Sequence, residues 1–259
     1  MRSTLAIAKK ELVVYFTTPI AYVAFVVMAF FAAQFFTRFL GGYRTIAVRV
    51  SPDDVQRLNL TDLVVSPLFA SVGVFLVLSA PLLSMRLLAE EKRGRTFELL
   101  MTTPVRPFEI VAGKYLAALA VTAVSIALVA LFPLLLSFFP MAQGGPAVEW
   151  QTVATGLVGL FLLGAMCMAV GLFVSALTES VIVAALVSLI VLLGLWMVTM
   201  FGVGAEGPLR DLTLGVSASE HLLPFLQGRI ELKDVVYYLS FVVLGLWLTD
   251  RVIEGHRWA

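Results

Sequence analysis

Long apolar stretches separated by short polar segments run through most of the chain. Six stretches approach or exceed the roughly 20 residues that a helix needs to cross a bilayer, namely 19–39, 66–88, 110–139, 153–177, 181–203 and 235–251. Backbone groups in lipid must form hydrogen bonds within their own segment, so each stretch is expected to be helical. The pattern therefore predicts an all-α polytopic membrane protein, with six transmembrane helices in a single domain over residues 1–259.

Residues 3–18, before the first span, have apolar side chains at helical spacing. One helical face collects Leu5, Ala8, Leu12, Tyr15 and Phe16. Lys10 and Glu11 are predicted to point away from this face. The pattern is typical of a helix that lies in the membrane interface, so we expect an elbow helix that leads into the first span at Pro19. The alternative is that these residues extend the first span inward.

Three further segments carry local signals. Pro133 in the third span indicates a kink or a partial re-entrant turn. The segments 41–65 and 204–233 are predicted to lie on the external side, the first as a loop and the second as short external helices capping a cleft or as a plain loop. The fourth span has a stripe of small residues that lets another helix approach, within the subunit or between two subunits: Gly164, Ala165, Ala169, Gly171, Ser175 and Ala176.

Composition supports the membrane assignment. Hydrophobic residues make up 60% of the chain and charged residues 14%, and the mean hydropathy is +0.99, which argues against a soluble globule. A net charge of +1 gives no indication of a nucleic-acid partner. Cys167 is the only cysteine, which excludes an internal disulfide and a thiolate metal cluster.

Lysine and arginine are distributed unevenly between the two predicted sides. An even number of spans places both termini, the 89–109 loop and the turn at 178–180 on one side. That side holds 11 of the 18 basic residues, namely Arg2, Lys9, Lys10, Arg86, Lys92, Arg93, Arg95, Arg106, Lys114, Arg251 and Arg257. Because cytoplasmic loops are enriched in Lys and Arg, both termini and the 89–109 loop are predicted to be cytoplasmic.

Common catalytic and nucleotide-binding motifs are absent from the sequence. The pair Gly113-Lys114 is followed by Tyr115 and is not a phosphate-binding loop, and neither HExxH nor GxSxG occurs. His221 and His256 stand alone at a predicted loop and tail. The middles of the spans lack the ionisable residues that proton-coupled transporters usually carry, and Lys114 is expected to extend from a span end. We expect no catalytic residue, bound cofactor or metal in this chain, and an energy source outside the membrane.

The segment 89–114 concentrates charge between two apolar spans. Glu91 and Arg95 at i,i+4 favour a helix over 89–103, and Pro104 ends it. Its apolar face, with Phe97, Leu100 and Met101, must be buried against membrane or a partner. The alternative is a solvated connector. We predict a docking site made of Glu90, Glu91, Arg93, Arg95, Thr96, Phe97, Glu98, Leu100, Met101 and Pro104.

The same segment resembles a family signature. The run EEKRGRTFELLMTTPVRPFEIVAGKYL is similar to ABC-2 type permeases, in which a Gly-Thr-x-Glu-Leu-Leu segment, a Pro and a Gly-Lys pair link the second and third spans. The matching positions are Thr96, Glu98, Leu99, Leu100, Pro104, Ile110, Gly113 and Lys114. The segments 9–22, 66–69 and 221–241 resemble the gliding-motility-type ABC exporter permease. In place of the glycine before Thr96 this chain has Arg95, with its glycine at position 94.

The resemblance implies a six-span permease subunit of an ATP-driven exporter in the bacterial cytoplasmic (inner) membrane. It would pair with a second copy or a sister permease, including one with a large external domain, and sit on two cytoplasmic ABC ATPase subunits that bind ATP and Mg. The 89–103 segment would be the coupling helix, with Phe97, Leu100 and Met101 anchoring the contact. Membrane lipid surrounds the spans, and the substrate is not identified.

A second class of function remains open beside export. An ATPase-coupled mechanotransmitting or regulatory membrane subunit would transmit force without translocating substrate. A continuous polar lining on the second and fifth spans would favour export, but Ser71, Ser79, Ser188 and Thr199 are too few to decide.

Overall fold

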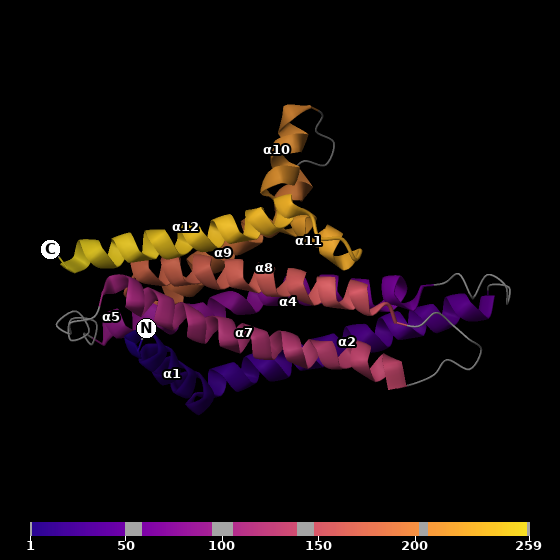
Figure 1. Cartoon of the computed structure of the whole chain (residues 1–259), viewed down its shortest axis with the longest axis horizontal. Coiled ribbons are helices and arrows are strands. Elements are labelled where there is room, and N and C mark those ends of the chain that lie inside the picture. Colours follow the sequence, from indigo (N-terminus) through magenta and orange to yellow (C-terminus); the bar gives the residue numbers. More distant parts are fainter. Residues whose placement is uncertain (1, 50–58, 95–105, 139–147, 202–206, 258–259) are drawn as a thin grey trace.

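The computed structural model is a bundle of long helices and describes residues 2–49, 59–94, 106–138, 148–201 and 207–257. Its described residues contain no strand, so the all-α prediction is confirmed. Six helical stretches are long and apolar enough to cross a membrane, namely Pro19–Arg49, Thr61–Arg93, Pro107–Phe138, Trp150–Leu177, Val181–Met200 and Leu232–Gly255. They run side by side along the long axis of the molecule (Figure 1).

The described elements follow one another along the chain with short connections. They are α1 (Arg2–Thr17), α2 (Pro19–Arg49), the π-helical turn η1 (Thr61–Val65), α4 (Ser66–Ser84), α5 (Arg86–Arg93), α7 (Pro107–Phe138), α8 (Trp150–Leu177), α9 (Val181–Phe201), α10 (Pro208–Val216), α11 (Ala218–Leu226) and α12 (Leu232–Arg257). The second predicted span thus combines η1, α4 and α5.

One local prediction from the sequence is wrong, and one of the two alternatives of a second is excluded. The expected loop over 41–65 is helical at both described ends, because α2 continues to Arg49 and η1 starts at Thr61. The side chain of Tyr43 is buried against the core and anchors the extension of α2. Helix α7 runs unbroken through Pro133, so the partial re-entrant turn does not form.

Helix α8 lies at the centre of the bundle. It packs against α4, α7, α9, α11 and α12, and its small residues allow these close approaches. A Cβ atom added to Gly171 would lie 2.0 Å from Ser84 Oγ on α4, and one added to Gly164 would lie 2.5 Å from Thr122 Cγ2 on α7. These glycines of the stripe in the fourth span therefore pack helices within one subunit.

The segment between α9 and α12 forms two short helices in its described part. Helix α11 packs against α4, α8 and α9, and its Phe225 is fully buried. Helix α10 projects sideways from the bundle (Figure 1). The described part of 204–233 is therefore helical over most of its length rather than a plain loop.

Both chain ends and α5 lie toward one end of the bundle, which we call the terminal end (Figure 1). Helix α1 stops at Thr17, a bend at Thr18 follows, and α2 starts at Pro19. The residues before the first span therefore form a separate helix instead of extending α2 inward. Helix α1 packs along the first part of α7.

Candidate functional site

The helix α5, which leads into residues 95–105, is offset from α4 by a break at Met85. Ser175 Oγ of α8 donates a hydrogen bond to the Met85 carbonyl at 2.9 Å. The same oxygen accepts hydrogen bonds from the backbone N–H groups of Leu88 and Ala89, at 3.1 and 3.0 Å. Because the first N–H groups of a helix have no partner within it, Ser175 acts as a cap supplied by another helix. Helix α8 thus holds the start of α5.

A buried cluster of charges joins α5 to two other helices at the terminal end. We call Lys10, Glu11, Glu91 and Lys114 the charged junction. The Lys114 ammonium of α7 lies 2.8 Å from Glu11 Oε1 of α1 and 3.0 Å from Glu91 Oε1 of α5. Lys10 approaches Glu91 at 3.4 Å. Two ammonium groups therefore face two carboxylates, and their opposite charges offset much of the cost of burial.

The degree of burial separates the members of the charged junction. The side chain of Lys114 is 2% exposed and that of Glu11 is 11% exposed, whereas the side chain of Lys10 is 62% exposed. The prediction that Glu11 points away from the buried face of its helix is therefore wrong. Lys114 likewise does not extend to the membrane surface, because its ammonium is satisfied inside the protein.

The neighbouring Gly113 allows α1 to lie directly on α7. A Cβ atom at this position would lie 2.8 Å from Ile7 Cγ2 and 2.9 Å from the Thr4 carbonyl oxygen. A second contact joins the two helices where Ser3 Oγ donates a hydrogen bond to Glu109 Oε1 at 2.7 Å. The Gly-Lys pair therefore combines close helix packing at its first residue with a buried ion pair at its second.

Tyr15 links α1 to the end of α4. Its hydroxyl donates a 2.6 Å hydrogen bond to the Leu83 carbonyl, and the side chain is buried. Burial, reinforced by the negative charge of Glu11, raises the pKa of Tyr15 above its usual range. The phenol therefore stays protonated and remains a donor at any physiological pH.

The predicted docking residues fall into a described and an undescribed group. Glu90 is exposed and pairs with Arg86 at 2.9 Å, and Arg93 is exposed. Glu91 turns inward to the charged junction. Helix α5 ends at Arg93, and Gly94 adopts a turn. The predicted helix over 89–103 is therefore interrupted at Gly94 in its described part, and a helix in its later part stays a prediction. The docking residues outside the described residues are Arg95, Thr96, Phe97, Glu98, Leu100, Met101 and Pro104.

Lys92 fastens α5 to the end of α8. Its Nζ donates a hydrogen bond to the Ala176 carbonyl in the last turn of α8. A cation at a helix C-terminus offsets the partial negative charge of the last carbonyl groups. The end of α5 is thus held on two sides, by Lys92 toward α8 and by Glu91 toward α1 and α7.

Sequence reasoning missed Glu11, Tyr15, Lys114 and Ser175 as parts of this site. A signal for the first two is present, because Ala8, Glu11 and Tyr15 follow helical spacing and share the buried face of α1. Nothing in the spacing shows that this face meets α7. Ser175 is one of several small residues in α8, and its role depends on the break at Met85.

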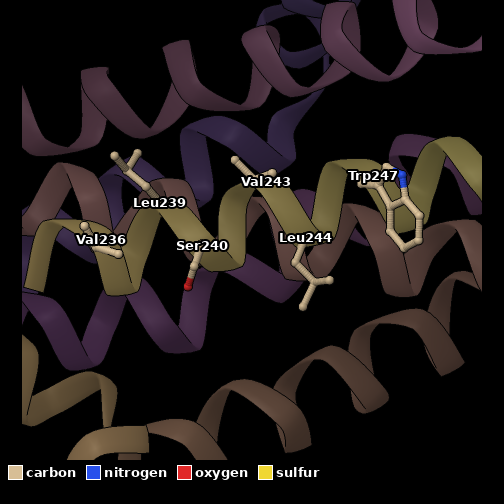
Figure 2. A pocket seen from close by; sticks show the side chains of 6 residues that line it. All are labelled: Val236, Leu239, Ser240, Val243, Leu244 and Trp247. Atoms are coloured by element: carbon tan, nitrogen blue, oxygen red, sulfur yellow. The ribbon is translucent and has the colours of Figure 1, made fainter. Parts of the chain in front are cut away.

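The outer surfaces of the spans are apolar. On α12 a shallow groove of about 450 Å³ is lined by Val236, Leu239, Ser240, Val243, Leu244 and Trp247. Figure 2 shows these side chains along the helix, with Ser240 as the one polar member. A second groove of about 290 Å³ lies between α2 and α4 and includes Phe75 and Ser79. Such surfaces suit lipid acyl chains in a bilayer.

The serine hydroxyl groups of the second and fifth spans do not form a polar surface on these helices. Ser71 and Ser79 donate hydrogen bonds to carbonyl oxygens of their own helix. Ser188 is buried. Within the described residues, these serines give no continuous polar lining.

Comparison with known proteins shows the family of the chain. The family model for ABC-2 family transporter proteins matches residues 5–251. No curated protein matches the chain. The matched region contains all six candidate spans almost completely, together with the charged junction. The chain therefore belongs to the ABC-2 transporter family, whose members are the non-catalytic, multi-pass membrane permease components of ABC transporters.

Proposed function

We propose that this chain is the permease subunit of an ATP-binding cassette exporter, in which it couples ATP hydrolysis by a separate cytoplasmic ATPase subunit to substrate export. The observation that carries the proposal is the charged junction. It lies where α5 leads into residues 95–105 and ties α5 to α1 and α7 through buried ion pairs. A force applied to this segment would reach three helices.

The local contacts suit the transmission of a displacement. Ser175 holds the start of α5, and Lys92 and Glu91 hold its end. Separating a buried ion pair leaves an uncompensated charge, which costs about 3–5 kcal/mol. Because that cost opposes separation, α5, α1 and the first part of α7 would move together when an ATPase pushes on the segment that follows α5.

The proposed assembly places the terminal end against the ATPase. Two cytoplasmic ATPase subunits would bind ATP and Mg, and a second copy of this chain or a sister permease would complete the membrane part. The bias of Lys and Arg supports a cytoplasmic position for both termini in a bacterial inner membrane. In the docking segment Phe97, Leu100 and Met101 would anchor the contact.

The inward position of Glu91 changes its proposed role. Glu91 would connect the docking segment to Lys114 instead of facing the partner. The exposed Glu90 and Arg93, together with Arg95 and Glu98, would orient the ATPase surface.

The test is co-purification with the ATPase encoded beside this chain, combined with permease-dependent ATPase activity. The double substitution Glu98→Arg and Leu100→Asp is expected to abolish both, because it reverses one charge and buries another in the apolar contact. Glu254→Arg is the control for the charge reversal at position 98, since Glu254 is half-exposed on α12. Undiminished binding and stimulation by the double variant would contradict the proposal.

A further inference from the structure

One histidine ties three helices together at the base of the projecting α10. The His221 Nδ1 atom of α11 lies 2.6 Å from Asp234 Oδ1 of α12. Its Nε2 atom lies 3.1 Å from the Gly215 carbonyl oxygen of α10. The ring also stacks on the phenol of Tyr237, with centroids 3.9 Å apart. His221 is predicted from the sequence to stand alone, but the fold gives it three partners.

Both ring nitrogens of His221 face groups that accept hydrogen bonds. A backbone carbonyl only accepts, and an ionised carboxylate only accepts, so both contacts form when the imidazole carries two protons. The pair also holds two protons in total if the Asp234 carboxyl group carries one of them and the His221 ring carries the other. The complete arrangement therefore needs one proton more than a neutral histidine beside an ionised Asp234.

Loss of that proton breaks one of the two contacts. Asp234 is 1% exposed, and its Oδ2 atom is buried with no hydrogen-bond partner in the described part of the chain. A buried carboxylate that loses its partner is costly, so the remaining ring proton stays on Nδ1. The nitrogen that loses its proton is Nε2, and its lone pair then faces the Gly215 carbonyl.

The other charges around His221 leave Asp234 as its main electrostatic partner. A cavity of about 400 Å³ beside the ring is lined by Glu220 from α11, Lys233 and Asp234 from α12, and Arg229 from the connection between these helices. Helix α10 contributes only Leu214 and Gly215 to this lining. Lys233 pairs with Glu231 at 2.7 Å, and Arg229 donates to Gln227.

Helix α10 depends on few attachments. It contacts α9 and α11, and Tyr237 donates a 2.6 Å hydrogen bond to the Val216 carbonyl at its end. A nine-residue helix is marginal without tertiary contacts. The contact from His221 to Gly215 is thus a substantial part of what holds α10 in place.

We propose that His221 and Asp234 form a proton-operated latch that holds α10 against α11 and α12. The latch is closed while the pair carries its additional proton, at lower pH. It loosens when the pair loses that proton at higher pH, and α10 is then held only by its other contacts with α9, α11 and Tyr237. This inference is independent of ATPase docking at the terminal end.

The test measures the mobility of α10 in the full-length protein in lipid nanodiscs. A nitroxide is attached at Leu212→Cys, which is selective because Leu212 is 64% exposed and the natural Cys167 is buried. Spectra are compared at about pH 5 and about pH 8.5. The ratio of docked to mobile α10 is expected to fall roughly tenfold from the lower to the higher pH, because one charge-assisted hydrogen bond contributes about that factor.

Two variants separate His221 from other sources of pH dependence. His221→Gln in the labelled protein is expected to leave α10 mobile at both pH values. His256→Gln removes the other histidine and is expected to keep the full response. A parent protein with no pH response, or a His221→Gln variant that keeps it, would overturn the latch.

A second measurement requires no substitution at the latch. In the labelled protein with ¹⁵N-histidine, the ring-nitrogen shifts of His221 and the nitroxide mobility are expected to change with the same midpoint. Midpoints that differ by more than about one pH unit would overturn the proposal, even if His221→Gln fails to fold.

Discussion

At the scale of single residues, Lys114 shows how this fold accommodates a charge inside an apolar bundle. Its ammonium is satisfied by carboxylates from two other helices, and Lys10 at the exposed rim balances the second negative charge. The cluster as a whole is neutral. Removing its central cation would leave Glu11 and Glu91 with only the exposed Lys10 of the charged junction as a counterion.

We therefore expect Lys114→Met to lower the free energy of unfolding by about 3–5 kcal/mol, because it removes the buried cation that lies between Glu11 and Glu91. Denaturant unfolding of the purified protein in detergent measures the change. Lys10→Met is the matched control, since the Lys10 side chain is 62% exposed, and its expected effect is below about 1 kcal/mol. Equal losses in the two variants would show that burial of Lys114 does not decide the outcome.

At the scale of elements, α8 organises the bundle because it has little side-chain volume where its neighbours cross it. Gly171 meets Ser84 near the end of α4, and Ser175, one turn further along α8, caps the start of α5. The same helix thus sets the position of the α4 end and of the α5 start. Packing of α8 and placement of α5 are therefore linked.

Gly171→Ala tests this link. The added methyl group would lie 2.0 Å from Ser84 Oγ and 2.5 Å from Ser84 Cβ, so we expect a destabilisation of about 1–3 kcal/mol from overpacking. Thermal unfolding in detergent measures it. Adding Ser84→Gly should restore much of the loss, and Gly194→Ala should be tolerated, because nothing lies within 4 Å of the added atom. A loss that Ser84→Gly leaves unchanged would refute the steric explanation.

At the scale of the whole molecule, two polar clusters lie at different places along the bundle. The terminal end holds the charged junction, while the connection between α9 and α12, part-way along the bundle (Figure 1), holds the His221 cluster. Helix α9 starts near the terminal end, after the turn that follows α8, and runs away from it (Figure 1). The arrangement supports opposite membrane sides for α10 and the C-terminal end of α12.

Cysteine labelling in intact cells checks this topology. Leu212→Cys on α10 is expected to react with a membrane-impermeant maleimide from outside, because it is exposed. Gly255→Cys near the end of α12 is also exposed, but it is expected to react only after permeabilisation. Labelling of Gly255→Cys in intact cells would contradict the cytoplasmic assignment of the C-terminus.

Much of the architecture could be predicted from the sequence because lipid imposes a simple rule. Apolar stretches of sufficient length must be helical, and six such stretches were enough to indicate the bundle. Helix ends were less predictable. Tyr43 extends α2 beyond its apolar run because its side chain finds a place in the core, and hydropathy carries no information about such a contact.

Part of the candidate site could likewise be predicted from the sequence, and part of it required the fold. Charge density and the motif predicted a docking segment, which stays a prediction; of its described members, Glu90 and Arg93 are exposed. Glu11, Glu91 and Lys114 required the fold, because they come from helices far apart in the chain and meet only when α1 lies on α7. His221 likewise gains its partners only where α10, α11 and α12 converge.

Local composition and periodicity were enough to predict the membrane-spanning helices and the concentration of charge after the second span. The fold was needed to show which charges are buried together, which glycines admit a neighbouring helix, and that His221 has a carboxylate partner. Ion pairing and close packing act over a few ångströms, between residues that the chain order keeps far apart.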